Sequence, residues 1–509
     1  MSSRNDKIKT LEDLAVILHD LKSQGKIIVH SHGVFDLLHL GHVRHFEQAK
    51  ALGDILIVTI TQDQFVNKGP HRPAFPQDMR AEMLASLEMI DFVAINRTPL
   101  AVEAIKLLKP DIYVKGSEYR QAADDITGGI MPETEAIHSV GGEIQFTEDI
   151  VFSSSSLINH YMSAFSPEVD EYLKGFRKQH SSDEVLSWID QARKLRPLVI
   201  GEAIIDDYLF TDILGKSSKD PVLATLYKHM DSFIGGSLAV ANHLAHFCEE
   251  VYLLTQLGDD PRDEDFIAKA LMPNIRPTFL TKKNTPTIHK QRILEDYSET
   301  KMLEIYRMND RVSTPEETNS LCAEMGKIFE KAGLTIVADY GHGMFNPQSI
   351  SYCCNGAPFL TVNAQSNAGN RGYNPISKYP RADYICLAGH EITLDARTRD
   401  PDLRTAVLGL SQRIDCPNIT ITQGKRGTLH YDPANGFYEA PALATQVRDR
   451  VGAGDAVLAV TSLLKKVGAP WDIVGFVGNV AGAELVGELG NRRSLEHITF
   501  SKHVISLLK

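Results

Sequence analysis

Short apolar runs alternate with segments of helical periodicity over most of the sequence. In its first third the apolar runs are residues 26–36, 53–63, 90–96 and 110–116. Helical spacing of apolar side chains marks the intervening residues 43–52 and 78–89. Strands separated by helices of this length predict βαβ units, and therefore a parallel sheet with ligands at the carboxyl ends of its strands. The sequence predicts an α/β fold.

The same alternation returns in a second, larger block. Its strand-like runs are residues 197–210, 250–258, 334–341, 358–365, 382–389 and 418–424. Residues 166–196 lie between the blocks and are charged and helical in period, with no strand-like run. We therefore expect three parts in 509 residues: a domain over 1–165, a helical connector over 166–195 and a second α/β domain over 196–509.

Charge and composition exclude several classes of protein. Lys and Arg number 53 against 65 Asp and Glu, which gives a formal net charge of −12. This balance argues against a nucleic-acid-binding protein and against attachment to a membrane surface through basic residues. Hydrophobic residues make up 43% of the chain, as in ordinary globular domains, so we expect a folded protein.

Cysteine usage and the N-terminus favour a cytoplasmic location. Six cysteines are spread over residues 248–416 without a CxxC pair, which argues against a zinc ribbon and against a disulfide framework. Residues 1–26 carry charge throughout and predict an amphipathic helix, not a signal peptide. No stretch reaches the ~20 apolar residues of a membrane span.

The first candidate site follows the first strand. Gly33 is placed at the end of that strand, and His39, Gly41 and His42 at the entrance to the next helix. A glycine lets the backbone approach a phosphate, and a helix N-terminus offers free N–H groups and a partial positive charge. Two histidines there suit an α-phosphate whose negative charge grows in the transition state. With His45 added, the same spacing also fits a metal site or a solvated helix face.

Residues 33–42, GVFDLLHLGH, resemble the HxGH signature of the nucleotidyltransferase superfamily, in its cytidylyltransferase and heptose-adenylyltransferase branch. Residues 66–93, 111–119 and 152–159 resemble later blocks of that branch in the same order. The resemblance implies a Rossmann-like domain with a parallel sheet. It also implies attack of an acceptor phosphate on the α-phosphorus of a nucleoside triphosphate, with release of pyrophosphate and no protein nucleophile.

The same resemblance implies the roles of individual residues. His39 and His42 would serve the α-phosphate as catalytic groups. Lys68 and Arg80, taken without the surrounding match, are also consistent with solvated surface charges. The implied nucleotide-binding residues are Gly33, Val34, Phe35, Asp36, Gly41, Lys68, Arg80, Ser153, Ser154, Ser155 and Ser156.

A second candidate site lies near the C-terminus. Gly452, Ala453 and Gly454 stand immediately before Asp455 and an apolar helix. Small residues at a helix start let consecutive N–H groups converge on a transferring phosphoryl group, and the adjacent carboxylate can take a proton from an attacking hydroxyl. The alternative is a plain helix N-cap by Asp455 after a glycine turn.

Residues 452–456, GAGDA, resemble the signature of the ribokinase-like sugar kinases, the phosphofructokinase-B family. Other blocks follow that family's order over residues 200–208, 234–245, 287–294, 337–345, 422–428 and 478–490. The resemblance implies a ribokinase-like α/β domain in which Asp455 is the general base and Gly452, Ala453 and Gly454 form an anion hole. Residues expected near the ATP base and ribose are Thr422, Gly424, Gly427 and Asn479; those expected near the sugar are Asp206, Gly235, Gly236, Lys290 and Arg292.

Several positions depart from this family or keep an alternative. Lys290 and Arg292 are equally compatible with charges on a strand surface. Asparagine carries no charge but still forms hydrogen bonds, so a different sugar or an altered metal arrangement is expected. Of the family's magnesium-organising pair only Glu391 is kept, which makes it the one metal candidate. The departures are Glu202, Ala239, Ala388 and the segment from Asn363 to Asn374.

Together the two sites predict synthesis of a nucleotide sugar. The whole chain resembles the bifunctional heptose kinase/adenylyltransferases of ADP-heptose synthesis, with the domain order reversed. This implies ATP-dependent phosphorylation of a heptose-like sugar or sugar phosphate, and nucleotidyl transfer from ATP or CTP, both with Mg²⁺. Sugar kinases of this family commonly form dimers, so the resemblance also implies a homodimer. The alternatives are a polyol-phosphate cytidylyltransferase fused to a separate carbohydrate kinase, or one half that only binds nucleotide.

Overall fold

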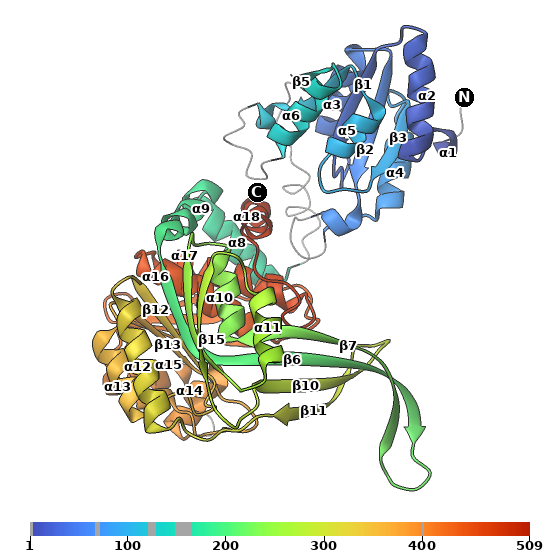
Figure 1. The fold of residues 1–509 in the computed structure, drawn as a ribbon. Helices are drawn as coiled ribbons and strands as arrows, with labels where there is room; N and C mark the ends of the chain where they lie inside the picture. The colour runs from blue at the N-terminus through green and yellow to red at the C-terminus, as the bar shows by residue number, and fades with distance from the viewer. Residues whose placement is uncertain (1–3, 67–71, 121–128, 148–164, 399–401) are drawn as a thin grey trace. The chain divides into compact units, whose positions relative to one another are not determined.

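The computed structural model describes residues 4–66, 72–120, 129–147, 165–398 and 402–509, which form two compact units. One unit comprises Met1–Leu173 with Ile498–Lys509, and the other comprises Lys174–His497. Figure 1 shows a sheet flanked by helices in each unit. Across the described ranges, no helix combines the length and the apolar character needed to span a bilayer.

The first unit is built on a five-stranded parallel sheet of order β3-β2-β1-β4-β5. Four of its strands fall on the predicted apolar runs, and β5 was not predicted. The strand order reverses between β1 and β4, and ligands of open α/β sheets bind at such a reversal. The strands are β1 (Ile28–Gly33), β2 (Ile55–Thr61), β3 (Phe92–Asn96), β4 (Ile112–Gly116) and β5 (Glu143–Thr147).

Helices cover both faces of this sheet because successive strand residues point to opposite sides. Val29 of β1 packs in one cluster with side chains of α3 and α4, whereas Ile28 packs in another with α2 and α5. The predicted N-terminal amphipathic helix is α2, which buries Leu14 and Leu18. The described helices before residue 165 are α1 (Arg4–Lys7), α2 (Leu11–Ser23), α3 (Leu40–Ala51), α4 (Gln77–Ala85), α5 (Val102–Leu108) and α6 (Ile130–Ser139). The boundary between the units falls within α8 (Pro167–Gln179), and α18 (His497–Leu508) lies at the C-terminal end of the chain.

The second unit contains a twelve-stranded sheet whose central part is parallel. The six predicted runs form β6, β8, β12, β13, β14 and β15, and the remaining six strands were not predicted. The strands are β6 (Pro197–Lys216), β7 (Leu223–Gly236), β8 (Val251–Leu257), β9 (Ile275–Thr281), β10 (Ile288–Glu295), β11 (Lys301–Arg307), β12 (Leu334–Asp339), β13 (Leu360–Ala364), β14 (Tyr384–Ala388), β15 (Asn418–Thr422), β16 (Thr428–Asp432) and β17 (Gly436–Ala440).

Helices α12 to α15 cover one face of the central sheet and α10, α16 and α17 the other (Figure 1). The cluster under α12 to α15 includes the buried strand residues Ile200, Val337 and Ile385. The helices are α9 (Ser182–Gln191), α10 (Ser237–Ala245), α11 (Pro261–Ala270), α12 (Pro315–Phe329), α13 (Pro347–Gly356), α14 (Gly389–Ala396), α15 (Leu403–Arg413), α16 (Ala453–Lys466) and α17 (Trp471–Val486).

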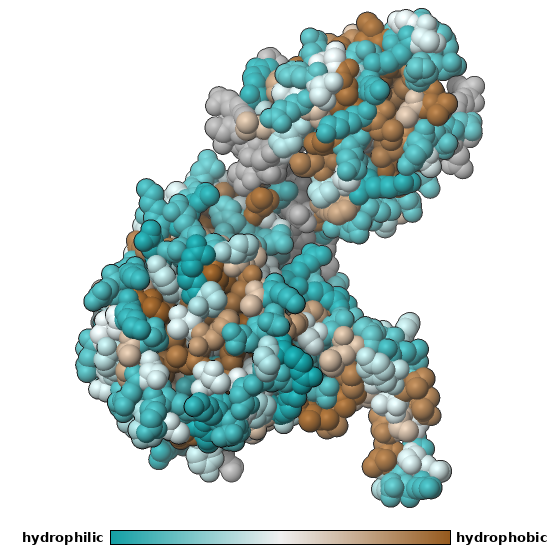
Figure 2. Space-filling view, viewed as in Figure 1, coloured by the Kyte–Doolittle hydropathy of each residue, from teal (hydrophilic) through white to brown (hydrophobic). Residues whose placement is uncertain are grey.

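Strand β6 belongs to two parts of the sheet. Its first half pairs with β8 and β12 in the core, and its second half pairs with β7 and β10. Beyond the core, residues 211–230 form a hairpin that projects from the unit (Figure 1), and we call it the arm. Figure 2 shows hydrophobic residues along the arm. Its exposed apolar side chains are Ile213, Leu214, Val222, Leu223, Leu226, Tyr227 and Met230.

Candidate active sites

His39 and His42 lie together where β1 leads into α3. His39 caps the helix, because its Nδ1 accepts a hydrogen bond of 3.1 Å from the Gly41 N–H, and His42 Nδ1 accepts one of 3.4 Å from the His39 N–H. The two rings stack with centroids 3.9 Å apart. Burial lowers the pKa of His39, which favours the neutral ring. Since Nδ1 accepts, the ring proton is on Nε2, which is buried and has no partner among the described residues.

Phe35 and Asp36 shape the loop beside these histidines. Phe35 adopts a left-handed backbone with φ of 49°, and its ring lies edge-on to His42 at 5.4 Å. A Cβ on Gly33 would lie 2.9 Å from the Phe35 ring, so glycine is needed for this close approach. The buried Asp36 accepts hydrogen bonds from the backbone N–H groups of Ala74 and Phe75. The loop after β1 is therefore held to residues 74–75.

Arg80 was expected to contact a phosphate, but the structure places its side chain differently. The side chain is fully buried, and its donors are used within the protein. Nε donates to the Phe75 carbonyl at 3.0 Å and Nη2 to the Thr61 carbonyl at 2.9 Å. Further bonds go to the Val34 carbonyl and to Asp63. Arg80 thus ties together the ends of β1 and β2 from within, and it is not the solvated surface charge of the alternative either.

The structure describes only some of the remaining predicted transferase residues. Gly33 ends β1, Val34 follows it, and Gly41 lies in the first turn of α3, all next to the reversal between β1 and β4. Lys68 and the serines Ser153, Ser154, Ser155 and Ser156 lie outside the described residues.

The second site is at the N-terminus of α16. Gly452 is the N-cap residue, with φ of 83°, and no side chain caps the helix. The N-cap alternative for Asp455 is therefore wrong, since Asp455 lies inside the first turn after Ala453 and Gly454. Burial raises the pKa of Asp455 to about 7. A carboxylate with a pKa near 7 is suited to accept a proton at neutral pH.

Asp206 and Gly235 meet close to this helix start. A Cβ on Gly235 would lie 2.2 Å from Asp206 Oδ2, and a Cβ on Gly452 would lie 2.0 Å from Asn491 Oδ1. Asn491 Nδ2 also donates to Asp206 Oδ2 at 3.3 Å. Gly236, with φ of 61°, follows at the end of β7. Asn491 was missed from the sequence, although it follows the last matched block directly.

Arg292 and Lys290 are buried on β10, so the alternative of strand-surface charges is wrong. Arg292 Nη1 lies 2.6 Å from Asp206 Oδ1, and its Nε lies 3.0 Å from Glu304. Lys290 lies over the Tyr306 ring at 5.6 Å, and burial lowers its pKa. Arg292 therefore pairs with the residue expected to bind the sugar.

The residues expected around the ATP base lie at the end of β15, in the turn after it and on α17. Thr422 ends β15, and the turn after it contains Gly424 and Gly427. Gly427 has φ of 89°, and a Cβ there would lie 2.0 Å from the Ala440 carbonyl oxygen. Asn479 of α17 is buried, and its Nδ2 donates to Thr428 Oγ1 and to the Gly475 carbonyl, both at 2.8 Å. Its amide therefore serves the packing of α17 against β16.

Glu391 is engaged by backbone groups and not arranged with other ligands. Its two oxygens accept from the N–H groups of Ser366 and Ala388, at 3.0 and 2.7 Å. Burial raises its pKa to about 7. Among the described residues, no group of three or more His, Cys, Asp or Glu side chains could hold a metal ion. Glu391 thus caps α14, and its expected metal contact stays a prediction.

The other residues that depart from the family pattern also lie inside the protein. Glu202 accepts from the N–H groups of Tyr340 and His342, both at 2.9 Å, and burial with the nearby Asp339 raises its pKa. Asn363 donates to the Cys386 carbonyl at 2.7 Å, and Ala239 is buried in α10.

Two further side chains contact Asp455. The Tyr340 hydroxyl and the Gln365 amide both donate to it, at 3.0 and 3.1 Å. Neither residue was predicted from the sequence. Each follows directly after a strand of the parallel sheet, β12 and β13, and a polar residue at that position was the available signal.

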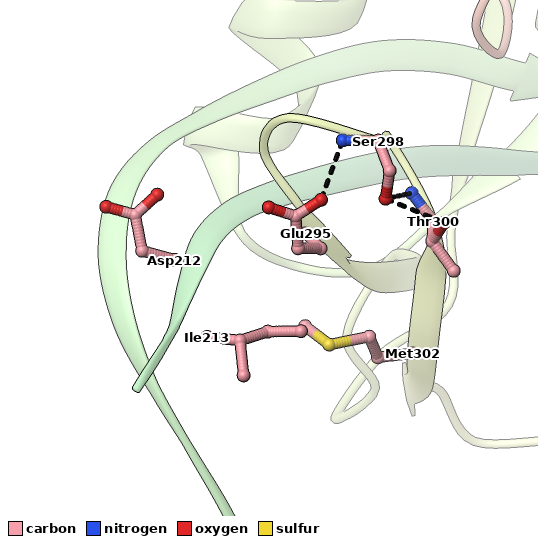
Figure 3. Close-up of a pocket in the computed structure, with 6 residues that line it drawn as sticks. All are labelled: Asp212, Ile213, Glu295, Ser298, Thr300 and Met302. Atoms are coloured by element: carbon pink, nitrogen blue, oxygen red, sulfur yellow. Dashed lines mark hydrogen bonds between the residues drawn. The ribbon is translucent and has the colours of Figure 1, made fainter. Parts of the chain in front are cut away.

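A cavity of about 580 Å³ lies elsewhere, at the base of the arm (Figure 3). Figure 3 shows Ile213 and Met302 pointing toward each other, with Glu295 accepting from the Ser298 N–H. None of its lining residues is a predicted site residue, so it is separate from the Asp455 site. They are Asp212, Ile213, Glu295, Ser298, Thr300 and Met302.

Comparison with protein families adds to this geometry. Residues 195–498, more than half of the chain, match the pfkB family carbohydrate kinases. The chain belongs to the pfkB family. Residues 31–160, which carry the His39 and His42 site, match the cytidylyltransferase-like family. The expected order of a cytidylyltransferase-like domain before a pfkB domain is confirmed.

Curated relatives match part of this pfkB family chain. The bifunctional protein HldE of a Nitratiruptor species is 44% identical over 138 residues, which is 27% of this chain and 30% of that protein. The bifunctional protein HldE of Aliarcobacter butzleri is 40% identical over 144 residues, 28% of this chain and 30% of that protein. The chain thus spans just under a third of the length of these relatives.

Solved structures confirm the α/β fold of the pfkB part. Phosphofructokinase-2 from Escherichia coli in complex with potassium aligns with a TM-score of 0.50 at 16% identity, covering 62% of this chain and 100% of that chain. The same enzyme in complex with fructose-6-phosphate gives 0.50 at 14% identity over the same shares. At this identity the likeness concerns the fold alone.

Proposed function

We propose that this chain is a bifunctional enzyme of nucleotide-sugar synthesis. The observation that carries the proposal is that the predicted catalytic residues lie at two separate helix N-termini, His39 and His42 at one and Gly452 to Asp455 at the other. Each lies in a part of the chain that matches the corresponding enzyme family. We assign the transferase to residues 1–165, a helical connector to 166–195 and the kinase to 196–509.

In the kinase reaction, Asp455 takes the proton from a sugar hydroxyl as its oxygen attacks the γ-phosphorus of ATP. The N–H groups of Gly452, Ala453 and Gly454 stabilise the charge on the transferring phosphoryl group. Asp206, Gly235 and Gly236 border the sugar, with Lys290 and Arg292 behind it. Thr422, Gly424, Gly427 and Asn479 border the base and ribose, and ADP leaves.

In the transferase reaction, a phosphate oxygen of the sugar phosphate attacks the α-phosphorus of the nucleoside triphosphate, and pyrophosphate leaves. The Nε2–H of His39 and the ring of His42 stabilise the α-phosphate as its charge grows. Gly33, Val34 and Gly41 let the phosphates approach the backbone, while Phe35 and Asp36 shape the nucleotide pocket. Lys68 and Ser153 to Ser156 are proposed for the triphosphate or the acceptor phosphate.

The substrate proposed is a heptose-like sugar or sugar phosphate. Support comes from the similarity of the transferase part to proteins named HldE. We propose that the chain corresponds to the heptose kinase/adenylyltransferases with its domains in reversed order. ATP is the kinase donor, and ATP or CTP the transferase donor. A polyol-phosphate cytidylyltransferase fused to a carbohydrate kinase is the second candidate, favoured by the cytidylyltransferase-like match.

Mg²⁺ is proposed as the companion of the triphosphates. The described residues offer no cage of protein ligands. Mg²⁺ bound to nucleotides keeps several waters and is held largely by phosphate oxygens, which such a site permits. It would neutralise triphosphate charge in both reactions. A cytoplasmic location is proposed because all six cysteines are free thiols, which suits a reducing compartment.

We also propose a homodimer formed through the arm. A two-stranded hairpin is marginally stable alone and needs further strands or packing. In an antiparallel pair, residues opposite each other share a face, so Ile213 with Thr225 and Asp212 with Leu226 lie on opposite faces. Apolar side chains are therefore exposed on both faces, including Ile213 and Leu226. A second copy would cover them with a matching arm, as in a two-fold dimer.

The testing experiment combines Mg²⁺, ATP or CTP, and a panel of sugar 1-phosphates that includes heptose phosphates, with pyrophosphate release as the readout. Release with one nucleotide and one sugar phosphate identifies the transferase substrates and names the sugar to offer the kinase. ADP formation from free sugars or other sugar phosphates is measured in parallel. Silence in both assays over the full panel would overturn the proposed function.

A further inference from the structure

The Asp455 carboxylate is held on one side only. Tyr340 Oη donates to Oδ1 at 3.0 Å, and Gln365 Nε2 donates to the same Oδ1 at 3.1 Å. Within the part of the chain that the structure describes, Oδ2 receives no hydrogen bond. Asp455 is 7% exposed, so the unbonded oxygen is the one left for a substrate.

Asparagine side chains hold the backbones of the two donor residues, Tyr340 and Gln365, in place. Asn370 Nδ2 donates to the Tyr340 carbonyl at 2.6 Å and to the Gln365 carbonyl at 3.2 Å, and so joins the ends of β12 and β13. Asn367 donates to the Tyr340 carbonyl at 2.8 Å, and Asn374 to the Gln365 carbonyl at 3.1 Å. The segment from Asn363 to Asn374, which departs from the family pattern, therefore positions Gln365 over the carboxylate.

We propose that Tyr340 and Gln365 are positioning residues for the sugar kinase reaction, which occupy Oδ1 of Asp455 so that Oδ2 is the atom that takes the proton from the sugar hydroxyl. This inference rests on the proposed kinase function. Two donors on one oxygen prevent rotation of the carboxylate and direct its other oxygen at the substrate. They also favour the ionised carboxylate, because a hydrogen bond to a charged group stabilises that form.

The surroundings of Asp455 show why these donors matter. Burial and the Asp206 carboxylate raise its pKa, whereas the hydrogen bonds from Tyr340 and Gln365 and the charge of Lys290 lower it. On balance the pKa is raised to about 7. Without the two donors the base would be protonated over more of the neutral range. The titratable and charged groups that face it are Asp206, Lys290, Tyr340, Cys386 and Glu391.

The test is the pH profile of kcat/KM for sugar phosphorylation in Tyr340→Phe. We expect its acidic midpoint to move up by about one pH unit, since a hydrogen bond to a charged group is lost. The matched control is Tyr379→Phe. Tyr379 is also a fully buried tyrosine that donates to an aspartate, but to Asp339 Oδ2 at 2.6 Å. Its variant should keep the wild-type midpoint.

Gln365→Leu is the second variant in the test. Its acidic midpoint should also move up, and the midpoint should move further when Gln365→Leu is combined with Tyr340→Phe. An unchanged midpoint in both single variants, or an equal shift in Tyr379→Phe, would overturn the inference. A substrate-free readout keeps this separate from the proposed function. The pH dependence of the melting temperature, compared with the same curve for Asp455→Asn, reports the titration of Asp455. That titration should move up in Tyr340→Phe even if no sugar is phosphorylated.

Discussion

The Arg292 guanidinium lies 2.6 Å from Oδ1 of Asp206, and both side chains are buried. Removing one partner of a buried ion pair leaves an uncompensated charge. We expect Arg292→Met to destabilise the second unit by about 3–5 kcal/mol and to raise KM for the sugar. Chemical denaturation and sugar saturation curves measure the two effects.

The control for this pair is Arg276→Met. Arg276 is 57% exposed by side chain and lies 3.2 Å from Glu250, so its loss should cost under about 1 kcal/mol. Equal destabilisation by the two variants would contradict the importance given to burial at Arg292.

The two reactions should be separable by single substitutions. Asp455→Asn should reduce sugar phosphorylation by at least about 10²-fold because the base is lost, while nucleotidyl transfer persists. His42→Ala should reduce pyrophosphate release by about 10²-fold or more and spare the kinase. His19→Ala, at an exposed position of α2, is the control and should change neither rate. Equal loss of both activities in either variant would speak against independent sites.

The kinase should depend on pH through Asp455. Its pKa is raised to about 7, so kcat/KM should fall as pH drops below about 7 and the base is protonated. The effect on stability has the opposite direction. The folded state holds this proton more tightly than the unfolded chain, so the stabilisation present at acid pH is lost as pH rises through about 7.

Glu391, whose pKa is also raised to about 7, adds an effect on stability of the same sign. Asp455→Asn should therefore melt at a higher temperature than the wild type at pH 8, and the difference should shrink toward pH 4. Melting curves across pH 4–8 measure this, and a difference independent of pH would contradict the assignment.

Gly452 should tolerate no side chain. An alanine there would combine a φ of 83° with a Cβ placed 2.0 Å from Asn491 Oδ1. We expect Gly452→Ala to lower stability by about 1–3 kcal/mol and to remove kinase activity, because the start of α16 must shift. At Gly454 a Cβ would meet nothing within 4 Å, so Gly454→Ala should keep the wild-type melting temperature. Similar melting temperatures for both variants would count against this account.

The arm should set the oligomeric state. Introducing charge at Leu223 or Tyr227, which are 54% and 61% exposed, should convert a dimer to monomers because apolar contacts would be lost. Sedimentation of Leu223→Asp and Tyr227→Asp measures this. Val16→Asp, at a 73% exposed residue of α2, is the control and should remain dimeric. A wild-type monomer at micromolar concentration would exclude the proposed dimer.

Features that depend on neighbouring residues were predictable from the sequence. The ten apolar runs became strands, and His39, Gly41, His42 and the glycines before Asp455 were placed correctly at helix starts. Strand and helix periodicity and the conformational freedom of glycine are local properties, so they are visible in consecutive letters. Seven strands were missed because their apolar pattern is weak. They are β5, β7, β9, β10, β11, β16 and β17.

Only the tertiary structure decided what the charged residues do. Nothing near Arg80 in the sequence shows that it is buried with Val34 and Thr61 as partners, and Arg292 meets Asp206 across 86 positions. Tyr340 reaches Asp455 across 115 positions. The physical reason is that a polar side chain's role depends on its burial and on the partners that desolvation forces on it, and chain folding supplies both from distant parts of the sequence.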